Sequence, residues 1–131
     1  MPSLDDWETW MQEVVREVQN WLHSRDTDID LAPRESRRDT RIGQIWRGRK
    51  KRFNIVCYHR LENEFRIELL LSRDLSDQLE KELQKIGLAA RYTDENRRLN
   101  IPVTQDGFER NKNFFRRIVD TTYEQAIEPR L

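Results

Sequence analysis

The sequence predicts a single α+β domain, 1–131, in which an antiparallel sheet is packed by helices in the order α-β-β-β-α-β-β-α. Two observations predict this class. Three segments carry apolar residues at the three- and four-residue steps of an amphipathic helix, and five segments are dense in β-branched and aromatic residues. A length of 131 residues suits one compact domain, and no internal repeat indicates a solenoid.

The first expected element is an amphipathic helix within residues 1–23. Its apolar positions recur at helical spacing from about residue 4 onward, and Ser3 is placed to cap it with Asp6 three residues later. Residues 24–40 follow as a charged connection, because apolar residues are few there and Pro33 interrupts regular structure. We expect this connection to be solvated.

Residues 41–128 are expected to form the sheet with two helices. The first three strands are predicted at 42–47, 52–60 and 64–71. Turns at Gly48 and at 61–63 join them into an antiparallel meander. In the third strand, Phe65 and Ile67 alternate with Arg66 and Glu68, which predicts an inward apolar side and an outward polar side.

The second half of this region continues with a helix that Ser72 or Asp74 can cap and that ends near Gly87. Two strands, 88–92 and 99–103, then flank a polar turn. Pro102 lacks a backbone N–H, which predicts that the second of these strands is an edge strand. The final helix is expected to begin near Asp106 and to end before Pro129.

Charge is distributed in blocks although the whole chain is neutral, with 24 basic and 24 acidic residues. Residues 1–31 carry a net charge of −6, and residues 34–52 carry +7. Two arrangements satisfy this asymmetry. Either the acidic and basic segments face each other, or the basic segment faces an external anion.

The basic run forms the predicted first hairpin tip between Trp46 and Phe53. Its members are Arg47, Arg49, Lys50, Lys51 and Arg52. A protruding basic ribbon suits phosphate contacts, and flanking aromatic rings suit stacking on unpaired bases, so nucleic acid is one expected partner. The alternative is a solvated turn whose aromatic neighbours point into the core.

Three of the four tryptophans, Trp7, Trp10 and Trp21, lie on the first predicted helix. Tryptophan is enriched at binding hot spots, so these residues are candidates for a partner-binding surface. An aromatic stripe at helical spacing is more often buried in a core than displayed on a surface. The sequence leaves both interpretations open.

Catalytic and metal-binding constellations are not expected, and neither is a cofactor. The two histidines, His23 and His59, lie on different predicted elements, and the single cysteine, Cys57, lies within an apolar strand. A metal-dependent hydrolase using the acidic segment at Asp26, Asp28 and Asp30 is the weaker alternative. No apolar run approaches the roughly 18 residues of a membrane span, and residues 1–6 lack signal-peptide features, so we expect a cytoplasmic protein.

This element order resembles type III secretion chaperones and the related YbjN-like proteins over about residues 4–126. The resemblance lies in the layout, including the strand pair around residues 94–97 and the apolar helix that follows it. The order is also similar to that of a domain attached to restriction-like nucleases. The lack of a catalytic constellation and the tryptophan-rich first helix predict a non-enzymatic binding module that forms a homodimer or binds a protein partner, and secretion chaperones are typically dimers. The alternative is a nucleic-acid-binding module that uses the basic hairpin, which the second resemblance suits better. Neither resemblance carries over a functional residue.

Overall fold

The computed structural model describes residues 7–32, 41–49, 51–62 and 64–127. Its helices are α1 Thr9–Arg25, α2 Arg73–Lys85, α3 Gln105–Arg110 and α4 Lys112–Ala126, and a 3₁₀ turn covers Arg47–Arg49. Its strands are β1 Ile29–Leu31, β2 Arg41–Ile42, β3 Gln44–Trp46, β4 Lys51–Arg52, β5 Val56–Arg60, β6 Phe65–Leu70, β7 Arg91–Thr93 and β8 Arg98–Pro102. The α+β class and the predicted order of the main elements are confirmed.

The strands form two antiparallel sheets where one was expected. A three-stranded sheet has the order β1-β3-β4, and a five-stranded sheet has the order β2-β5-β6-β8-β7. The expected strand 42–47 is divided at Gly43, so that β2 pairs with β5 and β3 pairs with β1 and β4. The expected strand 52–60 is divided in the same way into β4 and β5.

The charged connection 24–40 contains a strand that the sequence analysis did not predict. In β1, Ile29 is buried and pairs with Trp46 of β3, while Asp30 pairs with Ile45. A strand of three residues is too short to show the alternation of apolar and polar residues in the sequence. Residues 29–31 form a strand because their backbone pairs with β3. Residues 33–40 and the predicted helix cap at Ser3 lie outside the described residues.

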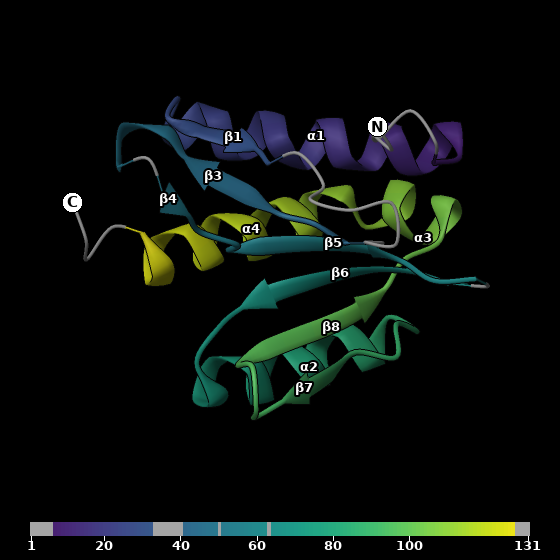
Figure 1. Cartoon of the computed structure of the whole chain (residues 1–131). Coiled ribbons are helices and arrows are strands. Elements are labelled where there is room, and N and C mark those ends of the chain that lie inside the picture. Colours follow the sequence, from purple (N-terminus) through teal and green to yellow (C-terminus); the bar gives the residue numbers. More distant parts are fainter. Residues whose placement is uncertain (1–6, 33–40, 50, 63, 128–131) are drawn as a thin grey trace.

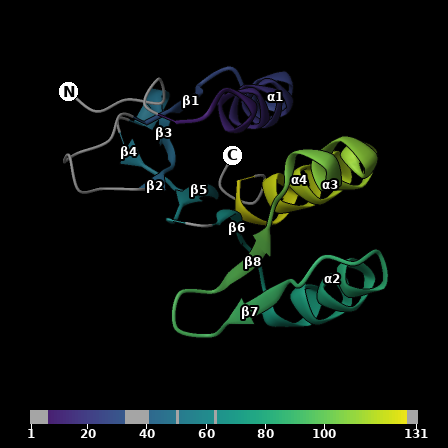
Figure 2. The same cartoon turned by 90° about the vertical axis from the view of Figure 1, so that its right-hand side faces the viewer.

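All four helices lie on one side of the sheets (Figures 1 and 2). The core fills the space between these helices and the inner sheet face. Its largest fully buried side chains include Tyr58 and Phe65 from the sheet, Leu22 from α1 and Phe115 from α4. Among the described helices, none combines the length and apolar composition that crossing a bilayer requires.

The helix ends follow local rules, with three departures from prediction. Gly87 has a φ of 86° and follows α2, as a C-terminal glycine should. The final helix is interrupted at Asn111, and Thr104 rather than Asp106 caps its first part, accepting a hydrogen bond from the Gly107 N–H at 3.0 Å. Helix α1 begins at Thr9, later than expected.

Strand β8 is an interior strand, which corrects the expectation that it would be an edge. It lies between β6 and β7, but β7 pairs only with residues 98–100 of β8. Pro102 pairs with Arg66 of β6 and lies beyond the end of β7. Its missing N–H therefore removes no bond to β7, because that side of Pro102 has no strand neighbour.

A side-chain amide joins the two sheets where the chain leaves one for the other. The register of β2 with β5, Ile42 with Tyr58, would place Gln44 opposite Val56 if β2 continued. The backbone of Gln44 instead belongs to β3. Its side chain takes the place of the missing strand, since Oε1 accepts from the Val56 N–H at 2.8 Å and Nε2 donates to the Val56 carbonyl at 2.5 Å.

The Gln44 side chain also belongs to a hydrogen-bond network with α1, and the neighbouring Gly43 lies close to Asn54. Gln19 Oε1 of α1 accepts from Gln44 Nε2 at 3.0 Å and from the Tyr58 hydroxyl at 2.9 Å. Asn54 Oδ1 accepts from the Gln44 N–H at 3.2 Å, and a Cβ at Gly43 would lie 2.0 Å from the same oxygen. Glycine is therefore required at position 43 for Asn54 to hold this place.

We predict that Gln44→Leu destabilises the protein by about 3 kcal/mol, because it leaves the buried N–H and carbonyl of Val56 without partners. Urea unfolding followed by circular dichroism measures the change. The matched control is Gln78→Leu on the exposed side of α2, for which we expect a change within about 0.5 kcal/mol. Equal losses in the two variants would contradict the role given to the Gln44 amide.

Candidate functional site

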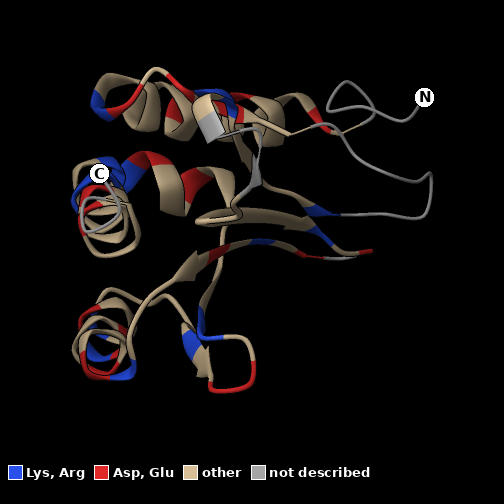
Figure 3. Cartoon of the chain, turned by 60° about the vertical axis from the view of Figure 1, so that its left-hand side comes forward, with Lys and Arg blue, Asp and Glu red and all other residues tan. Residues whose placement is uncertain are grey.

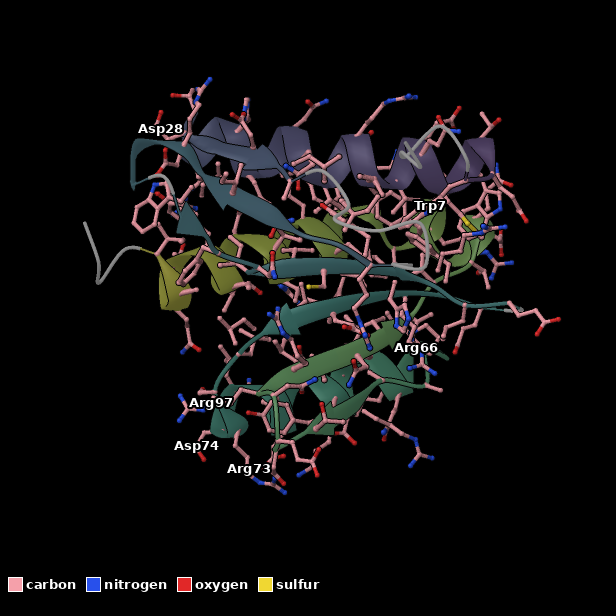
Figure 4. All side chains as sticks on the ribbon, in the orientation of Figure 1. Trp7, Asp28, Arg66, Arg73, Asp74 and Arg97 are labelled. Atoms are coloured by element: carbon pink, nitrogen blue, oxygen red, sulfur yellow. The ribbon has the colours of Figure 1, made fainter. Side chains whose placement is uncertain are left out.

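The three candidate tryptophans do not form one exposed surface. Trp7 is 3% exposed and meets Phe65 edge-on, and Trp21 is 6% exposed and stacks on Phe108. Both therefore belong to the core, which corrects their assignment to a partner-binding surface; Trp7 is labelled in Figure 4. Only Trp10 is half-buried, with its Nε1–H donating to Glu8 Oε2 at 2.9 Å.

The predicted basic hairpin exists, and β3 pairs with β4 across the turn at Arg47–Arg49. Trp46 is buried and packs edge-on against Phe53 at 6.1 Å, so its ring contributes to the core. This placement removes Trp46 from the set of rings available for stacking on a base. Lys50 and the side chains of Arg49, Lys51 and Arg52 lie outside the described residues.

The described part of the hairpin shows that acidic and basic segments meet within the molecule. Arg47 Nε lies 3.3 Å from Asp30 Oδ2, and its Nη2 lies 3.7 Å from Asp28 Oδ1 and donates to the Thr27 carbonyl at 3.1 Å. Asp28 is labelled beside this turn in Figure 4. Arg47 is therefore engaged by the acidic segment of the same molecule.

The outer side of the five-stranded sheet carries a polar surface that we call the arginine face. Directly opposed residues of antiparallel strands share a side of the sheet, so the register defines three rows. The first row is Arg41, His59, Arg66 and Pro102; the second is Cys57, Glu68, Asn100 and Arg91; the third is Leu70, Arg98 and Thr93. Four arginines thus surround one glutamate.

No described helix covers this face, because all of them pack on the opposite side of the sheet (Figure 2). The face is directed toward the reader in the orientation of Figure 4, where Arg66 is labelled, and Figure 3 shows how basic and acidic positions are distributed over the strands. The Arg41 and Arg66 side chains are 56% and 36% exposed, and Arg91 is exposed. Three guanidinium groups are therefore accessible to a partner.

An ion-pair network lies at the centre of the arginine face. His59 Nδ1 lies 3.2 Å from Glu68 Oε2, Arg41 Nε lies 3.5 Å from Glu68 Oε1, and both His59 and Glu68 are buried. Burial lowers the pKa of His59 below its ordinary value of 6.5, and the charge of Arg41 lowers it further, against the opposing effect of Glu68. Glu68 is thus held between a histidine and a permanent cation.

The remaining arginines differ in how they are held. Arg66 donates from Nε to Glu64 Oε2 at 2.8 Å, which orients its guanidinium along β6. The Arg98 Nη1 atom is buried and has no hydrogen-bond partner in the described part of the chain. An unpaired buried donor is costly, and an incoming acceptor that reached Arg98 would relieve that cost.

The acidic segment does not gather its three aspartates into one site. Asp26 accepts from the Asp28 N–H at 2.9 Å, while Asp30 contacts His23 Nε2 at 2.8 Å. Over the described ranges, no group of three or more His, Cys, Asp or Glu side chains converges as a metal site requires. The proposal of a metal-dependent hydrolase therefore receives no support from this segment.

Sequence reasoning located the outward position of Arg66 and Glu68 but missed the arginine face as a whole. The alternation along β6 was the available signal. Arg41 and Arg98 reach the same surface only through the pairing register, which the sequence does not display.

Comparison with known proteins finds no family model, no curated protein and no solved structure that matches the chain. The likeness to YbjN-like proteins and type III secretion chaperones therefore stays a prediction based on element order.

We predict that His59 makes the protein less stable in mild acid. As the pH falls through 6.5, the unfolded chain binds a proton at this position that the folded chain, with its lowered pKa, does not bind, so stability is lost. Between pH 7.5 and 5.5, His59→Asn should lose less stability than the parent in urea unfolding. His23→Asn, at an exposed position, is the control, and an unchanged slope for His59→Asn would contradict the prediction.

Proposed function

We propose that this chain is a non-enzymatic binding module that receives an acidic protein partner on the arginine face. The observation that carries the proposal is the placement of four arginines on the side of the sheet that no described helix covers. Guanidinium groups bind carboxylates through paired, charge-assisted hydrogen bonds, which favours a partner surface rich in Asp and Glu.

The geometry favours a protein over a nucleic acid. Proteins that bind single strands stack bases on aromatic side chains, but the rings of Tyr58, Phe65 and Tyr92 lie on the inner side of this sheet, as their pairing register places them. Glu68 at the centre of the arginine face repels phosphate and carboxylate alike, so the anionic groups of any partner must contact the arginines around it. The carboxylates of a protein are carried on separate side chains and can be spaced to do so.

The arginine face is suited to a small, flat contact. The first row crosses four strands, so it spans about 15 Å at the usual strand spacing. A second copy of the chain can supply acidic groups, since residues 1–31 carry a net charge of −6, and homodimerisation is one form of the proposal. The proposal includes a cytoplasmic setting, supported by the presence of only one cysteine in the sequence, which excludes a disulfide within the chain.

Nucleic-acid binding through the basic hairpin is the second candidate function. The observation that favours it is the pairing of β3 with β4 beside the turn at Arg47–Arg49, since this turn and β4 contain four of the five basic residues. Such binding would depend on phosphate contacts, because Trp46 is buried.

We predict that Arg66→Gln with Arg91→Gln weakens binding of a fluorescein-labelled peptide of ten alternating Glu and Leu residues by about five-fold, since two accessible cations are lost. Fluorescence anisotropy measures the affinity. The matched control, Arg110→Gln with Arg116→Gln on the helical side, removes the same net charge and should change affinity less than about two-fold.

Equal losses in both double variants would show that net charge, and not the arginine face, attracts the peptide, and would contradict the proposal. A labelled oligothymidine serves as the competing probe. Binding of that strand that is unaffected by the Arg66 and Arg91 changes, but lost when the hairpin residues Arg49 to Arg52 become Ser, would favour the nucleic-acid alternative. Light scattering after size exclusion reports whether the chain forms a dimer.

A further inference from the structure

A groove of about 610 Å³ lies at the end of the five-stranded sheet where β5 turns into β6. Its apolar lining comes from the start of α1, from β6 and from the end of β8, and includes Trp10, Met11, Phe65, Pro102 and Val103. Its charged lining comprises three glutamates, Glu8, Glu62 and Glu64, against the single cation Arg60. The groove is therefore apolar along part of its wall and acidic in balance, opposite in sign to the arginine face.

The aromatic wall of the groove is held in place before any ligand arrives. Trp10 meets Phe65 edge-on with ring centroids 5.6 Å apart, and its indole N–H donates to Glu8 at 2.9 Å. Phe65 is fully buried and is also contacted edge-on by Trp7 at 5.8 Å. Because Trp10 is held by both Phe65 and Glu8, its side chain loses little conformational entropy when a ligand binds. A preorganised side chain of this kind favours ligand binding.

The acidic side of the groove comes from the segment that joins β5 and β6. Glu62 is exposed, and Glu64 is half-buried with one oxygen, Oε2, engaged by Arg66 at 2.8 Å. The ion pair between Glu64 and Arg66 separates the groove from the arginine face, because Arg66 belongs to the first row of that face. The two surfaces therefore carry opposite charge on either side of one salt bridge.

We propose that this groove binds a basic segment of a partner protein, with the aliphatic stem of a Lys or Arg side chain on the Trp10 wall and its cationic head at Glu62 and Glu64. Lys and Arg combine an apolar stem with a charged head, which matches an apolar wall with an acidic rim. A cation near the indole adds a favourable contact with the ring. The volume suits a short segment of several residues, because a lone metal ion would leave the apolar wall uncovered.

The test measures binding of a fluorescein-labelled octapeptide of alternating Arg and Leu by fluorescence anisotropy. Glu62→Lys should weaken binding by about five-fold or more, because the cationic head would meet a like charge. The matched control is Glu95→Lys in the exposed turn between β7 and β8, which changes the net charge equally and should leave affinity within about two-fold. Trp10→Leu should also weaken binding of the octapeptide, because the aromatic ring is lost while an apolar side chain remains.

Three outcomes would overturn the proposal: no saturable binding of the octapeptide, equal losses for Glu62→Lys and Glu95→Lys, or a dimer of the parent protein that Glu62→Lys dissociates. The last would make a second copy the occupant of the groove. Arg91→Gln should leave binding of the octapeptide unchanged. Glu62→Lys should leave binding of the acidic Glu and Leu peptide unchanged. A failure at the groove is thereby distinguished from a failure at the arginine face.

Discussion

The fold depends on satisfying the buried backbone of Val56 at the point where one sheet ends and the other begins. A buried N–H and carbonyl without partners would oppose the division of the strands. Gln44 meets both needs with its side chain while its own backbone joins β3. Two sheets can therefore share one core, and the chain needs only Gly43 and Asn54 in close approach to make the change of direction.

The two sides of the five-stranded sheet carry different side chains, apolar on the inner side and charged on the outer side. Since the four helices occupy one side, the strand alternation directs Tyr58 and Phe65 into the core and Arg66 and Glu68 to the other side. Cations from β2, β6, β7 and β8 are then brought together by register alone. The acidic groove lies at the end of the same sheet, so both proposed contact surfaces depend on how β5, β6 and β8 are aligned.

The order of elements and the alternation in β6 were predictable because each is a local, repeated pattern. The two-residue and three-residue strands were not, since β1 and β2 are too short to show a period and exist through their partners. Trp10 and Trp21 were correctly placed on a helix, whereas Trp7 precedes α1, and a stripe does not reveal which other element lies against it. Phe65 and Phe108 cover Trp7 and Trp21, and those contacts join distant parts of the chain.

The glutamine junction also gives the molecule a local reporter. In most strands an amide hydrogen is protected by the neighbouring strand and exchanges with solvent only when that strand separates. The Val56 amide hydrogen is instead bonded to one side chain, so it loses its hydrogen bond when the Gln44 amide moves away. Deuterium uptake at Val56 therefore reports the seating of one sheet on the other, separately from the unfolding of the whole domain.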